Sequence, residues 1–305
     1  MSIDKKLLGK TDLLATRLAF GAMELRAPEH HRQANEILNT VLDCGINFID
    51  TSQDYGTSEE LIGNYISHRR SEYYIATKCG CDISGTGRGN AHIFTQEHIT
   101  KNLEDSLRKL KTDYIDFWQL HCVTPTDLPG GANDDIIQTM FDMKRAGKVR
   151  YIGVSFRGGK VTDACYPLQN QEDFAVEMAK WGVFDGFQMV YGALTRTSEK
   201  TMNEMKELGT GIIARGILKK YFPYYNEIVS HAKLHELYEQ GESESDFLIR
   251  FAMNINSVDT MIVGSSNPNH IKANTKAAEK GMLPHDVFEE AVRRLDSATT
   301  LNLES

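Results

Sequence analysis

The sequence lacks the features by which membrane proteins and secreted proteins are recognised. No apolar run approaches the roughly 20 consecutive residues that a membrane-spanning helix needs. The opening residues 1–6 have no apolar stretch of signal-peptide length behind them. We therefore expect a cytoplasmic protein without a membrane partner.

Cysteine is scarce, and the few residues present form no CxxC pair. The five cysteines among 305 residues are Cys44, Cys79, Cys81, Cys122 and Cys165. An odd number without regular spacing argues against a disulfide framework and is typical of a reducing compartment. Packing thiols are the favoured interpretation, also for Cys79, Cys81 and Cys122 near the strand ends described below. The sequence predicts no metal site.

Positive charge is in short supply. Lysine and arginine together number 34 against 42 aspartate and glutamate residues, which gives a formal net charge of -8. Binding to a nucleic-acid backbone needs a concentrated positive surface. The composition therefore argues against a nucleic-acid partner.

The glycine fingerprint of a doubly wound dinucleotide-binding fold is also missing. That fold needs G-x-G-x-x-G directly after an early strand, where the backbone approaches a pyrophosphate. The run 85–89, Gly-Thr-Gly-Arg-Gly, has neither the spacing nor the place, and it is interpreted as a flexible loop. Internal repeats, linkers and low-complexity tracts are absent as well, so we expect one domain over residues 1–305.

Short β-rich runs alternate with amphipathic stretches through most of the chain. The stretches 95–110, 134–146 and 198–208 carry apolar residues at the helical period. Alternating strands and helices favour a parallel sheet, and eight such units favour an α/β fold closed into a single (β/α)8 TIM barrel. The expected barrel strands are 18–21, 48–51, 73–78, 116–121, 151–155, 186–191, 211–214 and 260–264.

Segments outside these strands complete the predicted barrel. Residues 7–13 place turn residues between apolar ones, so we expect an N-terminal β-hairpin that closes the bottom of the barrel. Long loops at the C-terminal face follow three strands, at 79–94, 122–133 and 215–244. The last of them contains Tyr221, Phe222, Pro223, Tyr224 and Tyr225. It fits a lid or substrate wall, and equally a surface excursion that packs its aromatic residues.

Four polar residues stand at or just after the ends of three apolar runs. They are Asp50, Tyr55, Lys78 and His121. Because the carboxyl ends of parallel barrel strands meet at one mouth, their side chains are expected to converge there. An acid, a phenol, an ammonium and an imidazole in one pocket suit proton transfer to a carbonyl group.

Each of the four has an ordinary role when it is considered alone. Asp50 is then a cap, Tyr55 a packing aromatic, Lys78 a solvated strand end and His121 a hydrogen-bonded core histidine. Four such coincidences in the right order are less probable than one shared site.

The blocks around these residues resemble the aldo-keto reductase family. Gly-Ile-Asn-Phe-Ile-Asp-Thr at 45–51, followed by Tyr55 and Gly56, is similar to the family's strongest signature. Ile-Ala-Thr-Lys at 75–78, Asp-Tyr-Ile-Asp at 113–116 and the block 147–155 are similar to its later motifs. The resemblance implies a barrel that binds a nicotinamide cofactor in extended form and exchanges hydride with a small-molecule carbonyl or alcohol substrate.

The resemblance also implies the catalytic roles. Tyr55 is the proton donor, Lys78 and Asp50 tune it, and His121 orients the carbonyl. Elementary chemistry agrees, because a free phenol has a pKa of about 10 and a nearby ammonium lowers it. Asp50 keeps Lys78 charged, and a neutral His121 donates to the oxygen as negative charge develops there.

Residues that would hold the nicotinamide match the family unevenly. Ser155 and Gln188 stand at positions that bind its carboxamide, whereas Phe156 stands where many members have asparagine. Arg215 replaces the usual aromatic residue, and its planar guanidinium is able to stack on the nicotinamide. A surface salt bridge is the alternative role of Arg215.

The segment that would grip the adenosine phosphate lies near the C-terminus. Gly264, Ser265, His270 and Asn274 are the residues implied there, with a helix starting near Pro268 to favour an anion. Members that strongly prefer the phosphorylated cofactor usually have Lys and Arg at the positions of Gly264 and His270. We expect NADP(H) as the cofactor, with NAD(H) as a second one.

Two alternatives come from other functional classes. The fold also serves as a nicotinamide-binding regulatory or sensor module, although such relatives typically carry an added N-terminal segment. A lyase would use Lys78 as a Schiff-base nucleophile, which a protonated lysine beside Asp50 disfavours. Met23, Glu24 and Trp118 are candidate pocket-wall residues, with the core as the alternative place for Trp118.

Overall fold

The structure is a computed structural model that describes residues 2–82, 92–156, 168–218 and 225–303. Several features singled out in the sequence fall outside these ranges. They are the glycine-rich run 85–89, Cys165, Tyr221, Phe222, Pro223 and Tyr224.

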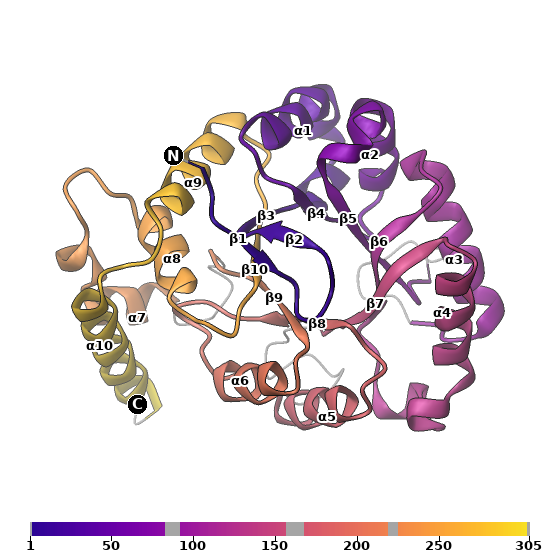
Figure 1. Cartoon of the computed structure of the whole chain (residues 1–305). Coiled ribbons are helices and arrows are strands. Elements are labelled where there is room, and N and C mark those ends of the chain that lie inside the picture. Colours follow the sequence, from indigo (N-terminus) through magenta and orange to yellow (C-terminus); the bar gives the residue numbers. More distant parts are fainter. Residues whose placement is uncertain (1, 83–91, 157–167, 219–224, 304–305) are drawn as a thin grey trace.

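Eight parallel strands close into a barrel, as predicted (Figure 1). Each strand pairs with its sequence neighbours, and the last strand pairs with the first to complete the closure. The strands are β3 (Leu18–Gly21), β4 (Phe48–Asp50), β5 (Tyr74–Cys79), β6 (Ile115–His121), β7 (Val149–Ser155), β8 (Gly186–Val190), β9 (Gly211–Arg215) and β10 (Thr260–Val263). The sequence pattern thus located every barrel strand to within two residues at each end.

Within the described residues, ten α-helices and six short 3-10 helices accompany the barrel strands. The α-helices are α1 (Ala34–Asp43), α2 (Ser58–Ile66), α3 (Gln96–Leu110), α4 (Asp135–Arg145), α5 (Leu168–Lys180), α6 (Glu199–Glu207), α7 (Tyr225–Ala232), α8 (Glu244–Met253), α9 (Pro268–Lys280) and α10 (His285–Leu303). The 3-10 helices are η1 (Ala22–Arg26), η2 (Pro28–Gln33), η3 (Ser67–Glu72), η4 (Pro125–Asp127), η5 (Gly131–Asn133) and η6 (Leu234–Leu237). Most of the α-helices surround the barrel, and α7 and α10 lie together outside this ring (Figure 1).

The predicted helix starts have a local chemical cause. Helix α3 begins after Thr95, whose hydroxyl accepts a hydrogen bond from the backbone N–H of His98. The carboxylate of Asp134 does the same for the N–H of Ile136 at the start of α4. Side-chain oxygens at these positions satisfy backbone donors that have no partner within the helix.

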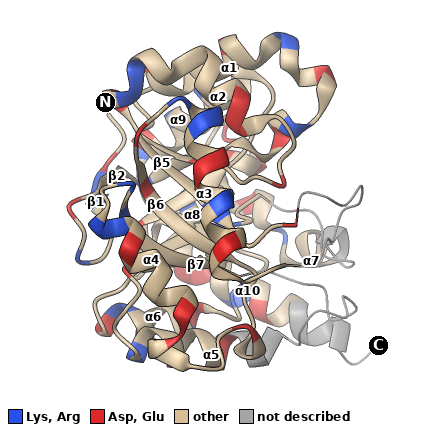
Figure 2. Ribbon diagram, turned by 90° about the vertical axis from the view of Figure 1, so that its right-hand side faces the viewer, with Lys and Arg blue, Asp and Glu red and all other residues tan. Residues whose placement is uncertain are grey.

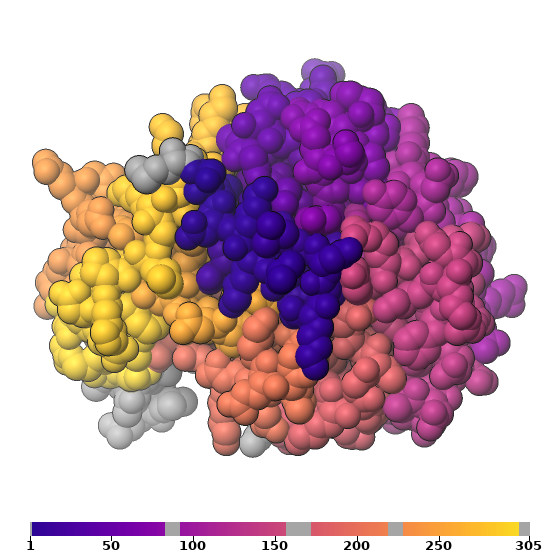
Figure 3. Space-filling model, viewed as in Figure 1, coloured from indigo at the N-terminus to yellow at the C-terminus, as the bar shows by residue number. Residues whose placement is uncertain are grey.

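The N-terminal hairpin covers the bottom of the barrel. Strands β1 (Lys5–Leu7) and β2 (Leu14–Thr16) pair antiparallel, and their residues lie over the barrel end in Figure 3. Leu8 and Leu13 between them are fully buried in one hydrophobic cluster with residues of the barrel strands. Gly9 has a φ of +56°, and a Cβ there would lie 2.3 Å from the backbone nitrogen of Gly211. The hairpin prediction is therefore confirmed, and only glycine permits so close an approach.

The outer surface carries both signs of charge. Figure 2 shows Lys and Arg side by side with Asp and Glu over the helices that face the viewer. Among the described residues, no helix is both long enough and apolar enough to cross a membrane.

Candidate active site

The side chains of the predicted site come from the C-terminal ends of the barrel strands. Asp50, His121, Ser155 and Arg215 are the last residues of β4, β6, β7 and β9. Lys78 is the penultimate residue of β5. Strand register brings neighbours to the same level, since His121 is paired with Ser155, which in turn is paired with Gln188. The barrel thus gathers these residues at one mouth.

Asp50 and Lys78 form a buried ion pair. Lys78 Nζ lies 2.7 Å from Asp50 Oδ2 and also donates to the backbone carbonyl of Thr51 at 2.7 Å. Lys78 is 0% exposed and Asp50 is 3% exposed. Burial alone would lower the pKa of Lys78, but Asp50 and Tyr55 act against it and the net shift is upward. The lysine is therefore held as an ammonium.

A chain of buried amides continues from the second oxygen of Asp50. Gln188 Nε2 donates to Asp50 Oδ1 at 2.7 Å, and Gln119 Nε2 lies 3.3 Å from the same atom. Ser155 donates to Gln188 Oε1 at 3.0 Å. Since the aspartate accepts only, the Gln188 amide is fixed in one orientation. Sequence reasoning found Asp50, Ser155 and Gln188 but missed Gln119.

The position of Gln119 carried a signal. It lies two residues before His121 in β6, so the pleat directs both side chains to the same face of the sheet. It is also the register partner of Lys78. A second polar residue on the same strand face as His121 indicates the layer just below the mouth.

Tyr55 stands in the turn between β4 and α2. Lys78 Nζ lies 4.9 Å from the centre of the Tyr55 ring, and the phenol borders the cavity described below. Loss of water contact raises the pKa of Tyr55, while the Lys78 ammonium pulls it down by a smaller amount. The expected downward shift is therefore wrong for the net pKa, because burial of the phenol outweighs the ammonium. The sign of the Lys78 effect is as expected.

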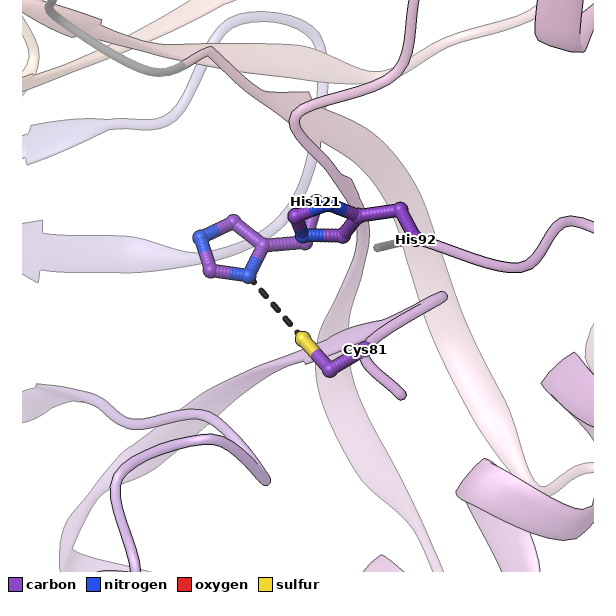
Figure 4. Close-up of side chains that lie close together, drawn as sticks. All are labelled: Cys81, His92 and His121. Atoms are coloured by element: carbon purple, nitrogen blue, oxygen red, sulfur yellow. Dashed lines mark hydrogen bonds between the residues drawn. The ribbon is translucent and has the colours of Figure 1, made fainter. Parts of the chain in front are cut away.

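His121 points toward the thiol of Cys81, a contact that the sequence pattern does not predict. Its Nδ1 lies 3.0 Å from Cys81 Sγ and 3.9 Å from Asp54 Oδ1. The ring of His92 meets the ring of His121 edge-on, with centroids 5.3 Å apart (Figure 4). Burial, with Asp54 nearby, raises the pKa of the Cys81 thiol, so the sulfur is protonated near neutral pH. His121 itself is 12% exposed.

A cavity of about 330 Å³ opens above the ion pair. Its wall is formed by Gly21, Met23, Glu24, Asp50, Tyr55, Gln188, Arg215, Gly216, Ile217, Leu218, Ile262, Val263 and Gly264. Met23 and Glu24 are thus wall residues, as expected. Trp118 is fully buried in the hydrophobic core, so of the two places expected for it the core is correct and the pocket wall is not.

Arg215 and Phe156 show how this chain departs from the expected nicotinamide contacts. Arg215 Nη2 donates to the backbone carbonyl of Phe156 at 2.6 Å, which holds the guanidinium at the cavity wall. The Phe156 ring stacks on Phe187 with centroids 6.2 Å apart and is buried in the core. Phe156 therefore contributes packing where an asparagine would offer a polar group.

The segment implied in adenosine phosphate binding lies at the start of α9. Gly264 borders the cavity, and α9 begins at Pro268, as expected. Ser265 Oγ accepts from the backbone N–H of Asn267 at 3.1 Å, and so it shapes the turn before the helix. His270 is exposed in the first helical turn, and Asn274 is buried one turn later. The structure thus places Gly264 at the cavity and the other three residues along the adjoining turn and helix.

Comparison with known proteins gives a consistent family match. The model of the Aldo/keto reductase family matches residues 17–295. The chain is 26% identical to the uncharacterized oxidoreductase YqkF of Bacillus subtilis, covering 97% of this chain and 96% of the relative. It is also 26% identical to L-galactose dehydrogenase of Arabidopsis thaliana, covering 90% and 88%. The holo form of aldo-keto reductase AKR11C1 from Bacillus halodurans superposes with a TM-score of 0.81 at 26% identity, covering 96% of each chain.

Proposed function

The chain belongs to the aldo/keto reductase family of oxidoreductases, and from that premise we propose that it is an NAD(P)H-dependent carbonyl reductase with Tyr55 as the proton donor. The buried Lys78–Asp50 pair beneath the Tyr55 ring carries this proposal. The reverse reaction is oxidation of the corresponding alcohol.

The residues at the mouth fit a nicotinamide cofactor. The cavity wall runs from Tyr55 and Gln188 past Arg215 to Gly264, which gives an elongated molecule continuous contact. Ser155 and Gln188 offer polar atoms for a carboxamide, and the Arg215 guanidinium offers a flat cationic face. The bound cofactor supplies the hydride that the carbonyl carbon receives.

Proton delivery is the task of Tyr55. The phenol gives its proton to the substrate oxygen as charge develops there, and a phenolate remains. The Lys78 ammonium stabilises that phenolate, and Asp50 keeps the buried ammonium charged. This arrangement also argues against a lyase, because a protonated lysine is no nucleophile.

His121 orients the carbonyl through the nitrogen that does not face Cys81. A neutral thiol donates to Nδ1, which assigns the ring proton to Nε2. An Nε2–H donor then meets the substrate oxygen as it becomes negative. Cys81 acts here as a positioning residue.

NADP(H) is the proposed cofactor, and NAD(H) is accepted as well. The first turn of α9 carries the exposed His270, and no arginine stands at that position. A histidine lacks the bidentate fork with which an arginine holds a 2′-phosphate, so it binds that group less strongly. The preference between the two cofactors is accordingly small.

The proposed substrate is a small aldehyde or ketone, with sugar aldehydes as one class to test. The relative from Arabidopsis thaliana is an L-galactose dehydrogenase, and polar groups such as Glu24 and Arg215 face the cavity. A panel of aldehydes, keto-sugars and keto-steroids with NADPH and NADH tests the proposal through loss of the reduced cofactor's absorbance. Tight cofactor binding without turnover of any carbonyl would favour the sensor module instead.

A further inference from the structure

Three side chains with metal-binding atoms meet beside the proposed active site. Cys81 follows β5, His121 ends β6, and His92 lies on the segment that returns toward β5 (Figure 4). One ligand atom from each lies within 4.8 Å of the other two. We propose that Cys81, His92 and His121 form a Zn²⁺ site, and that zinc bound there inhibits the enzyme by displacing His121. The inhibition, but not the binding, rests on the proposed function.

The backbone holds two of these residues opposite one another. Cys81 and His92 form an antiparallel bridge, and the backbone N–H of Ile93 donates to the carbonyl of Gly80 at 2.8 Å. His98 Nε2 donates to the carbonyl of Cys81 at 3.1 Å and fixes it from the side of α3. The relative position of thiol and imidazole is therefore set before any metal arrives.

The path of the chain at this point depends on glycine. Gly80 has a φ of +88°, and the Phe94 ring would lie 2.3 Å from a Cβ at that position. The Phe94 ring in turn stacks on His92, with centroids 6.1 Å apart. Gly80 and Phe94 thus support the side of the cluster that carries His92.

The donor atoms select the metal. One thiolate and two imidazoles suit Zn²⁺, whereas Mg²⁺ and Ca²⁺ take oxygen ligands. Asp54 Oδ1, at 3.9 Å from His121 Nδ1, provides a carboxylate within reach of the fourth position, which water otherwise fills. As the sulfur–zinc bond forms, the thiol proton leaves to solvent, and neither partner is oxidised or reduced.

Occupancy requires His121 to move. Ligand atoms around tetrahedral zinc are about 3.3–3.6 Å apart, given bonds of roughly 2.0–2.3 Å. The Cys81–His121 separation of 3.0 Å is already close to this, whereas other separations extend to as much as 4.8 Å. Drawing the three side chains together shifts them by about 1 Å, and a shift of that size in a catalytic group costs about 100-fold in rate.

The binding test uses Co²⁺ as a spectroscopic probe in the full-length chain, after removal of any affinity tag. We expect visible bands of a tetrahedral site and a thiolate-to-cobalt band in the near ultraviolet, both abolished by excess Zn²⁺. Cys81→Ser removes the thiolate band, and His92→Gln weakens Zn²⁺ binding by at least about 10-fold in calorimetry. Absence of the thiolate band in the unaltered chain, or its survival in Cys81→Ser, overturns the site.

Two matched control variants each remove a thiol or an imidazole outside the proposed zinc site. Cys44→Ser deletes a half-buried thiol on α1's C-terminal side, and His285→Gln deletes an imidazole that is 88% exposed. Both are expected to bind metal as the unaltered chain does. Metal binding that depends on Cys44 or His285 would assign the ligands elsewhere. If Cys81→Ser fails to fold, His92→Gln carries the test.

The inhibition test measures carbonyl reduction with and without zinc. At saturating Zn²⁺ the unaltered enzyme is expected to lose at least about 10-fold in turnover and to regain it with a chelator. The turnover of His92→Gln is compared with its own rate without zinc. Because this variant binds zinc more weakly, its half-inhibition is expected at a zinc concentration higher by the same factor. Cobalt and zinc binding without loss of turnover overturns the inhibition and leaves the site in place. Failure to turn over any carbonyl counts against the proposed function, while the cobalt spectrum still decides the site.

Discussion

Lys78 Nζ lies 2.7 Å from Asp50 Oδ2, and both side chains are buried at the mouth of the barrel. A lone charge at either position would be costly, because the interior cannot solvate it. Together they form a neutral ion pair in which the carboxylate keeps the lysine protonated. The ammonium also lies 4.9 Å from the centre of the Tyr55 ring.

Tyr55→Phe is expected to lower kcat/KM for carbonyl reduction by at least about 100-fold, because general-acid catalysis typically contributes that much. Cofactor affinity, measured by fluorescence titration, should remain nearly unchanged, since the ring and its packing are kept. Tyr65→Phe in α2 is the matched control and should retain full activity. Full activity in Tyr55→Phe would defeat the assignment of the proton donor.

Lys78→Met is expected to shift the pH profile of the residual activity to higher pH. Lys78 lowers the pKa of Tyr55 against the larger effect of burial, so its removal raises that pKa further. Alcohol oxidation needs the phenolate and rises as pH passes the Tyr55 pKa. The rising limb should therefore appear at higher pH in Lys78→Met than in the unaltered enzyme.

The readout is the pH dependence of kcat/KM for oxidation, measured alongside Lys101→Met on the exposed side of α3. In Lys101→Met the rising limb of the pH profile should appear at the same pH as in the unaltered enzyme. If the rising limb of Lys78→Met stays at the same pH or moves to lower pH, the Lys78 ammonium does not lower the pKa of Tyr55.

Much of the fold and of the site was predictable because both depend on local periodicity. Polar residues at the ends of apolar runs, such as Asp50 and His121, identify the mouth once the strands are known to be parallel. Gln119 was missed although it shares a strand face with His121, because that spacing does not show which residue its side chain meets. Its role depends on its register with Lys78, which only the closed barrel reveals.

Other features depend on balances that a sequence does not display. The net pKa shift of Tyr55 follows from burial and charge together, and only the packed site shows that burial dominates. Cys81 and His92 come together as partners of an antiparallel bridge, a pairing that no sequence motif indicates. Trp118 was ambiguous because a strand residue next to a site faces either the interior or the helices.

His270→Arg is expected to increase the preference for NADPH over NADH. The side chain is exposed in the first turn of α9, so an arginine there has room to extend. A charge-assisted contact with a 2′-phosphate should lower KM for NADPH by about 10-fold and leave KM for NADH nearly unchanged. His285→Arg, at an exposed side chain outside α9, is the control.

The result is read as the ratio of kcat/KM values for the two cofactors with one carbonyl substrate. An equal change for NADPH and NADH would show that position 270 does not face the 2′-phosphate. That result would contradict the proposed place of the adenosine phosphate and leave the role of Tyr55 untouched.

Asp259 at the bottom of the barrel offers a test of stability that leaves the mouth intact. Its carboxylate is fully buried and contacts Lys206 Nζ at 2.6 Å from each oxygen, with Lys6 Nζ at 3.2 Å. It also accepts from the backbone N–H groups of Gly9 at 3.1 Å and Ile212 at 3.0 Å. It thereby ties the N-terminal hairpin to β9.

Asp259→Ala leaves two ammonium groups and two backbone donors without this acceptor. We expect the free energy of unfolding in urea to fall by about 3–5 kcal/mol, the range for breaking a buried ion pair. Asp12→Ala breaks the exposed pair with Arg150 and should cost less than about 1 kcal/mol. Similar losses in the two variants would mean that the buried carboxylate adds no more than a surface charge. Because Asp259 is far along the strands from Tyr55, the folded fraction of Asp259→Ala should keep its kcat at low temperature.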